Sequence, residues 1–195
     1  MCGIFGFIGK SSPDVDRLRL IARLAGTRGP HTWGQAWLDH GLLSCRRYEG
    51  NLDPARVVSA KVLIGHARLA TSGDLSLGNA QPISSPEIAI AHNGNIYNHQ
   101  AIFDLYGYSP KTANDSEAIL AILLRSSPGE ILELVDPRSP LAVLAIVRGT
   151  LVAVRRGHPL WVGRFREGNY FCSRKFPQAE EFPDTDFHVF EVMDE

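Results

Sequence analysis

Short apolar runs separated by turn residues make up most of the chain. The first run, Ile4–Ile8, predicts a buried strand. Two pairs of runs surround short turn sequences and predict hairpins, 34–38 with 42–46 and 141–147 with 151–155. Further strands are expected at 61–69, 87–92, 160–165, 169–173 and 187–192.

Other segments have helical spacing. Apolar residues recur every three or four positions in Asp14–Gly26, and Pro13 suits the first turn of a helix there. Asn98–Tyr106 predicts a short helix, and Ser116–Leu124 predicts a buried one because it is apolar on most faces. Many strands with helices in blocks predict an α+β fold of packed sheets with covering helices.

A fourth helix is expected to begin at Ser127–Glu130. This segment has the pattern of a capping box. In such a box Ser127 accepts a hydrogen bond from an early helix N–H, and the Glu130 side chain reaches back.

Length and composition fit a single globular domain over residues 1–195. Hydrophobic residues make up 44% of the chain and charged residues 21%, which allows a substantial core. The formal net charge of -1 argues against a nucleic-acid partner, because phosphate binding favours a basic surface. No apolar run is long enough to cross a membrane, so no membrane association is expected.

The chain is predicted to be cytoplasmic. Its first ten residues lack a basic stretch and contain three glycines, which favours a strand over a signal peptide. Three cysteines, an odd number, do not suggest a disulfide framework. Cys45 and Cys172 lie in apolar strand patterns and are expected in the core. No cysteine or histidine spacing supports zinc, and no cofactor is predicted.

Cys2 is the candidate nucleophile. Removal of Met1 would give Cys2 a free α-amine. An α-amine has a pKa of about 7.7–8.0 and a thiol one of about 8.5, so the neutral amine can take the thiol proton. One residue would then be nucleophile and base. The alternative is a small buried side chain, and position 2 alone does not decide between the two.

Asn93 and Gly94 follow a predicted strand and precede a helix. The pair is first of all a turn signal. Such a turn can also direct the Asn93 amide and the Gly94 N–H towards one point, as an oxyanion hole requires. A glycine there lets a substrate approach the backbone closely.

Arg68 and Asp115 have two interpretations each. Arg68 needs a carboxylate partner, which is either internal or part of a ligand. Asp115 or Ser116 can cap the following helix, and Asp115 can instead accept from a substrate ammonium. His66 is interpreted as a core histidine with satisfied hydrogen bonds. A nucleophile, an oxyanion hole, a cation and an anion together suit a free α-amino acid with a reactive side-chain carbonyl.

Six motifs occur in the order of a known family. They are Cys2–Gly6, Arg28–Pro30 with Gly34, Gly65–Gly73, Asn79–Pro82, His92–Asn98 and Asp115–Glu117. Together they resemble the class-II glutamine amidotransferase (glutaminase) domain, and Asn93–Gln100 is similar to asparagine synthetase. The resemblance implies the four-layer αββα sandwich of two mainly antiparallel sheets that is typical of N-terminal-nucleophile (Ntn) hydrolases.

The same resemblance implies roles for residues. Cys2 would be the nucleophile with its α-amine as base, and Asn93 with Gly94 the oxyanion hole. Arg68 would bind the carboxylate of L-glutamine, and Asp115 its ammonium. The remaining pocket residues would be Leu69, Thr71 and Asn95.

Three residues depart from the family pattern. His31 stands where the family usually has Asp, which affects the loop after Arg28–Pro30 more than the chemistry. Leu69 and Gln81 replace the Trp and His of some relatives, which favours the synthetase-like branch.

The expected reaction is hydrolysis of glutamine to glutamate and ammonia through a γ-glutamyl thioester on Cys2. Family enzymes usually fuse this domain to a synthetase, transferase or isomerase, so the expected partner is a separate ammonia-accepting synthetase or transferase. Two alternatives remain: hydrolysis of another γ-glutamyl amide, and a catalytically silent subunit that senses glutamine or scaffolds a synthetase. The complete set of candidate site residues argues against the silent subunit.

Overall fold

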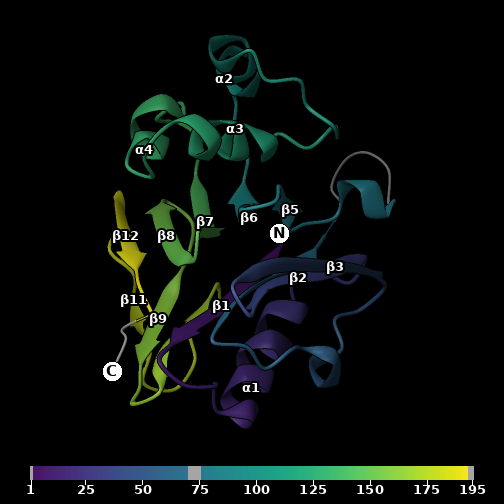
Figure 1. The fold of residues 1–195 in the computed structure, drawn as a ribbon, viewed down its shortest axis with the longest axis vertical. Helices are drawn as coiled ribbons and strands as arrows, with labels where there is room; N and C mark the ends of the chain where they lie inside the picture. The colour runs from purple at the N-terminus through teal and green to yellow at the C-terminus, as the bar shows by residue number, and fades with distance from the viewer. Residues whose placement is uncertain (1, 70–75, 193–195) are drawn as a thin grey trace.

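Two antiparallel sheets pack face to face, and helices cover the outer face of each (Figure 1). The computed structural model describes residues 2–69 and 76–192. The layers run helix, sheet, sheet, helix. This arrangement confirms the predicted α+β, αββα fold class.

The first sheet has the strand order β11-β9-β10-β1-β4-β2-β3. Its strands are β1 Gly3–Gly9, β2 Thr32–Asp39, β3 Leu42–Glu49, β4 Val62–Arg68, β9 Trp161–Arg164, β10 Gly168–Cys172 and β11 Glu180–Glu181. The second sheet has the order β12-β8-β7-β6-β5. Its strands are β5 Ile83–Ser84, β6 Ile88–Gly94, β7 Leu141–Val147, β8 Thr150–Arg156 and β12 Asp186–Phe190.

The described helices are α1 Val15–Gly26, α2 His99–Tyr106, α3 Glu117–Arg125 and α4 Glu130–Leu134. The long helix α1 covers the first sheet, two shorter helices, α3 and α4, cover the second, and α2 packs against α3 (Figure 1). The Asp14 carboxylate begins α1 by accepting from the Arg17 N–H at 2.8 Å. None of the helices in the described ranges is long and apolar enough to cross a membrane.

Strand alternation divides the core into three apolar layers. Along β1, Phe5 and Phe7 pack towards α1, whereas Ile4 and Ile8 pack between the two sheets. The third layer lies between the second sheet and its helices, and α3 is buried on nearly all sides there. The prediction that α3 is buried is therefore confirmed.

The expected strands and helices are all present, with ends displaced by a few residues. The capping-box prediction is only partly correct. Glu130 does reach back to accept from the Ser127 N–H at 3.3 Å. The Ser127 hydroxyl, however, points at the same carboxylate at 3.5 Å instead of accepting from a helix N–H, and Gly129 occupies the N-cap.

Candidate active site

The start of β1 and the ends of β4 and β6 meet between the sheets. Gly3 pairs with Ala67, so β1 begins beside the end of β4. β1 also contacts β6 of the other sheet (Figure 1). Ile4 packs with Ala91 between the sheets. Because side chains two positions apart share a face, the candidates Cys2, Arg68 and Asn93 all face this space.

The Cys2 thiol is held by the backbone of Leu69. Its Sγ accepts from the Leu69 N–H at 3.3 Å and lies 3.6 Å from the Leu69 carbonyl oxygen. Burial raises the pKa of the Cys2 thiol, while the Leu69 N–H and the charge of Arg68 act in the opposite direction. The net shift keeps the thiol protonated at neutral pH, so the reaction needs a base beside it.

The other two cysteines have different surroundings. Cys172 is fully buried, and burial raises the pKa of its thiol to about 12, which confirms the core prediction. Cys45 is only half-buried, in the edge strand β3, with its Sγ 3.7 Å from the Pro82 oxygen. It packs against the core between the sheets but also borders a surface hollow together with Arg47, so the prediction that Cys45 is a core residue is only partly correct.

Asn93 and Gly94 are the last residues of β6. The Asn93 side chain is 3% exposed, and its Oδ1 has no hydrogen-bond partner among the described residues. Gly94 has φ of 142°, and a Cβ there would lie 2.0 Å from the Pro140 oxygen. The position therefore admits only glycine.

Asp115 holds the turn that follows Gly94. Its Oδ2 accepts from the Ile96 N–H at 2.6 Å. Ser116 is the N-cap residue of α3 but makes no side-chain cap bond. The prediction that Asp115 or Ser116 is the N-cap is therefore correct in position for Ser116, which lacks the side-chain bond of a cap, while Asp115 binds the Ile96 N–H.

Three residues of the family motifs form a polar network that sequence reasoning did not identify. The Gln81 side chain accepts from the His92 N–H at 2.7 Å and donates to the His92 oxygen at 3.3 Å. The Ser116 hydroxyl lies 2.8 Å from His92 Nδ1 and 3.2 Å from Gln81 Nε2. Burial lowers the pKa of His92 to about 4. The network fixes the strand end that carries Asn93.

Glu117 is a second residue whose role was missed. Its carboxylate is buried and accepts from the Tyr108 hydroxyl, the Lys111 N–H and the Thr112 N–H at 2.6–2.9 Å. These bonds satisfy the buried charge and hold the loop that leads into Asp115. The one sequence feature that could have indicated this role is the position of Glu117 in the motif Asp115–Glu117.

His66 is buried as predicted, with no full-strength hydrogen bond to its ring among the described residues. Burial, with the neighbouring His92 and Arg68, lowers the pKa of His66 to about 3. His66 is therefore a neutral imidazole between the sheets, so the prediction of a core histidine is confirmed, while its hydrogen bonding within the described residues is limited to a weak contact with the His92 backbone.

The remaining predicted residues are Arg68, Leu69, Asn95 and Thr71. Arg68 ends β4 and is half-buried, and Leu69 contacts Cys2 directly. Asn95 is exposed in the turn after β6. Thr71 lies outside the described residues. No cluster of three or more potential metal ligands occurs in the ranges 2–69 and 76–192.

Comparisons with known proteins show which family the chain belongs to. The family described as "Glutamine amidotransferase domain" matches residues 1–174. Glutamine–fructose-6-phosphate aminotransferase (isomerizing) of Brucella abortus is 31% identical over 204 residues, which covers 95% of this chain and 33% of that protein. The enzyme of the same name from Zymomonas mobilis is 31% identical over 89% of this chain and 32% of its own length.

Solved structures share the fold. Glutamine phosphoribosylpyrophosphate amidotransferase from B. subtilis superposes with a TM-score of 0.72 at 22% identity, over 88% of this chain and 42% of that one. A glutamine aminotransferase class-II domain protein from Silicibacter pomeroyi superposes with a TM-score of 0.64 at 13% identity, over 98% and 95%. The chain spans about a third of the length of the curated relatives reported above.

Proposed function

We propose that this chain, which belongs to the class-II glutamine amidotransferase family, hydrolyses L-glutamine to glutamate and ammonia. The observation that carries the proposal is the Cys2 thiol, held on the Leu69 N–H where β1, β4 and β6 meet. We further propose that residues 1–195 form one glutaminase domain. Strands β11 and β12 support this, because they lie beyond the matched residues yet complete the two sheets.

The first half of the reaction forms a thioester. The freed α-amine of Cys2 takes the thiol proton, and the sulfur attacks the side-chain carbonyl carbon of glutamine. Asn93 Nδ2 and the Gly94 N–H stabilise the resulting oxyanion. The C–N bond then breaks, the amine returns its proton to the leaving nitrogen, and ammonia departs from a γ-glutamyl thioester.

The second half releases glutamate. The α-amine takes a proton from a water molecule, and the water oxygen attacks the thioester carbon. The C–S bond breaks, the sulfur regains a proton, and the acid product leaves. The raised pKa of the buried Cys2 thiol makes an adjacent base necessary.

Two charged side chains are proposed to bind the head of the substrate. Arg68 is suited to the α-carboxylate, because its planar guanidinium matches that group. Asp115 is suited to the α-ammonium, with its second oxygen occupied by the Ile96 N–H. Leu69, Thr71 and Asn95 complete the proposed pocket.

The ammonia acceptor is proposed to be a synthetase or transferase protein. The curated relatives named above are aminotransferases whose names include fructose-6-phosphate, and about two thirds of their length lies outside the matched region. A protein with free cysteines at positions 2, 45 and 172 suits the reducing cytoplasm, where we place this one.

A glutaminase assay tests the proposal. Purified protein should release glutamate from glutamine, and Cys2→Ala should abolish the release. Cys45→Ala and Cys172→Ala should keep most of it, because neither thiol lies beside the α-amine.

Intact mass should show that Met1 is absent from active protein, and a diazoketone analogue of glutamine should add mass to the Cys2 peptide. Turnover of other γ-glutamyl amides but not glutamine would contradict the proposal, as would binding without turnover.

A further inference from the structure

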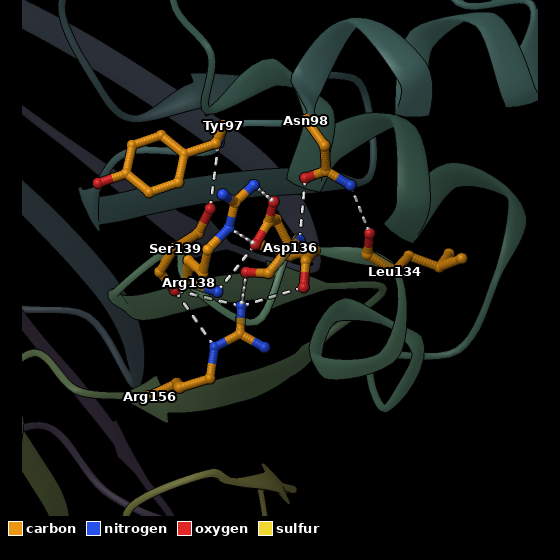
Figure 2. Close-up of polar contacts among 8 residues, drawn as sticks. Tyr97, Asn98, Leu134, Asp136, Arg138, Ser139 and Arg156 are labelled. Atoms are coloured by element: carbon orange, nitrogen blue, oxygen red, sulfur yellow. Dashed lines mark hydrogen bonds and ion pairs between the residues drawn. The ribbon is translucent and has the colours of Figure 1, made fainter.

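Arg156, the last residue of β8, binds a series of backbone carbonyl groups. Its guanidinium Nη2 donates to the oxygens of Val135 at 3.1 Å, Asp136 at 2.7 Å and Ser139 at 3.2 Å. Its Nη1 donates to the Leu132 oxygen at 3.2 Å. Figure 2 shows the guanidinium directed into this segment. Leu132 and Val135 belong to the end of α4, where a helix leaves carbonyls unpaired.

The segment that Arg156 binds, residues 132–139, holds the turn after Gly94 in three places (Figure 2). The Tyr97 N–H donates to the Ser139 hydroxyl at 3.1 Å. The Asn98 side chain donates to the Leu134 oxygen at 2.8 Å and accepts from the Asp136 N–H at 3.0 Å. The shape of the turn is therefore set by two backbone groups and one hydroxyl of segment 132–139.

The same segment continues into direct contact with Gly94. Pro140 follows Ser139, and its oxygen lies 2.0 Å from the place a Cβ of Gly94 would take. Leu141 pairs with Gly94 in the sheet. A shift of 139–141 would therefore move the Gly94 N–H, one of the two donors proposed for the oxyanion.

We propose that Arg156 is a positioning residue for the glutaminase reaction. By fixing segment 132–139, Arg156 places the Gly94 N–H and the turn 94–98 relative to Cys2. This inference rests on the proposed function. Lysine could supply the charge, but it cannot donate to several carbonyls in the plane of a guanidinium.

Arg155 provides a matched control. It is the preceding residue, and it also binds backbone: its Nε donates to the His158 oxygen at 2.8 Å, and its Nη1 donates to the Phe182 oxygen. Its Nη2 donates to the Glu181 carboxylate at 2.6 Å. These contacts hold the segment around β11 instead of the turn 94–98, so loss of Arg155 should destabilise the fold without moving Gly94.

Hydrogen exchange tests the placement without depending on activity. In Arg156→Gln, amides of the peptide covering 93–99 should exchange at least about tenfold faster than in the parent, because bonds to a charged group are lost. Arg155→Gln should leave that peptide unchanged. Equal protection in Arg156→Gln and the parent would overturn the inference, as would equal loss in both variants.

Steady-state kinetics tests the consequence, with active sites counted by titration with the diazoketone analogue. Arg156→Gln should lower kcat per titrated site about tenfold with little change in KM, less than the roughly 10²–10³-fold cost of losing a donor. Arg156→Lys, the milder change, should recover only part of kcat. An unchanged kcat in both variants would overturn the inference. An inactive parent would instead contradict the proposed function, and the exchange experiment would still decide whether Arg156 holds the turn.

Discussion

At the residue scale, Asn93 shows how burial and hydrogen bonding bear on the proposed catalytic groups. Asn93 is nearly buried, and its Oδ1 lacks a protein partner within the described residues. A buried polar group without a partner is costly, so it is retained where a ligand or the chemistry uses it. Oδ1 can only accept a hydrogen bond, so this observation marks a buried acceptor at the site, while the donor proposed for the oxyanion is Nδ2 of the same amide.

Asn93→Ala should lower kcat while leaving KM for glutamine nearly unchanged. An oxyanion donor acts mainly in the transition state, and losing one costs on the order of 10²–10³-fold in kcat. Glutamate release measured over a range of glutamine concentrations separates the two parameters. A raised KM with normal kcat would mean that Asn93 only binds substrate.

Asp115→Asn should raise KM for glutamine strongly. The amide oxygen of asparagine can still accept from the Ile96 N–H, so the variant removes charge while preserving the turn contact. A hydrogen bond to a charged group is worth roughly 1.5–3 kcal/mol, which predicts a KM increase on the order of 10- to 150-fold.

A substrate that lacks the α-amine provides the control for this prediction. It should be poor for the parent and lose little further in Asp115→Asn. An unchanged KM for glutamine in folded Asp115→Asn would limit Asp115 to holding the turn. Arg68→Lys should be impaired as well, because a point charge does not reproduce a bidentate carboxylate contact.

The sequence supports some of these residues better than others. Cys2, Asn93 and Gly94 are visible as candidates in residue type and motif order, although each of these signals alone has a structural alternative. The Gln81–His92–Ser116 network is not visible in that way, because its members come from separate segments and its meaning depends on tertiary contact. His66 shows the same limit, since burial could be predicted but the absence of partners within the described residues could not.

At the element scale, β6 and β7 set the geometry of the proposed oxyanion hole. Gly94 and Leu141 are a cross-strand pair, and the chain reaches Leu141 through Pro140. Apolar runs predicted both strands. The two-residue strands β5 and β11 were not predicted, because such short pairings follow from neighbouring strands more than from their own residues.

Gly94→Ala should destabilise the fold by on the order of 2–5 kcal/mol, which combines a positive-φ cost with overpacking. The added Cβ would meet the Pro140 oxygen at 2.0 Å. Urea unfolding at constant m-value measures the change. Gly149→Ala is the control, because Gly149 also has positive φ, 96°, but no atom lies within 4 Å of its added Cβ. Equal losses in the two variants would rule out the steric contact as the cause.

At the scale of the whole molecule, the sandwich buries two neutral imidazoles near the proposed site. Burial lowers the pKa of His66 to about 3 and that of His92 to about 4 from an ordinary 6.5. Both groups stay neutral in the fold while the unfolded chain takes up protons below pH 6.5. Stability contributed by each neutral histidine is therefore present above pH 6.5 and is lost as pH falls towards the folded pKa.

His66→Leu should make the protein less sensitive to acid. One extra proton bound by the unfolded state changes the free energy of unfolding by about 1.4 kcal/mol per pH unit, so one buried neutral histidine costs about 2 kcal/mol between pH 7 and pH 5. The variant cannot titrate at position 66 and should lose about that much less than the parent over the same interval. Since the ring nitrogens have no hydrogen-bond partner in the described ranges, an apolar side chain of similar size should fit at pH 7 without leaving a donor unpaired.

Urea unfolding at pH 7, 6 and 5 gives the slope of the unfolding free energy against pH. His40→Gln serves as the control. The His40 side chain is 96% exposed, so this variant should leave the slope of unfolding free energy against pH unchanged. Parallel slopes for the parent and His66→Leu would mean that His66 takes up its proton in the folded state, and that the space between the sheets is open to water.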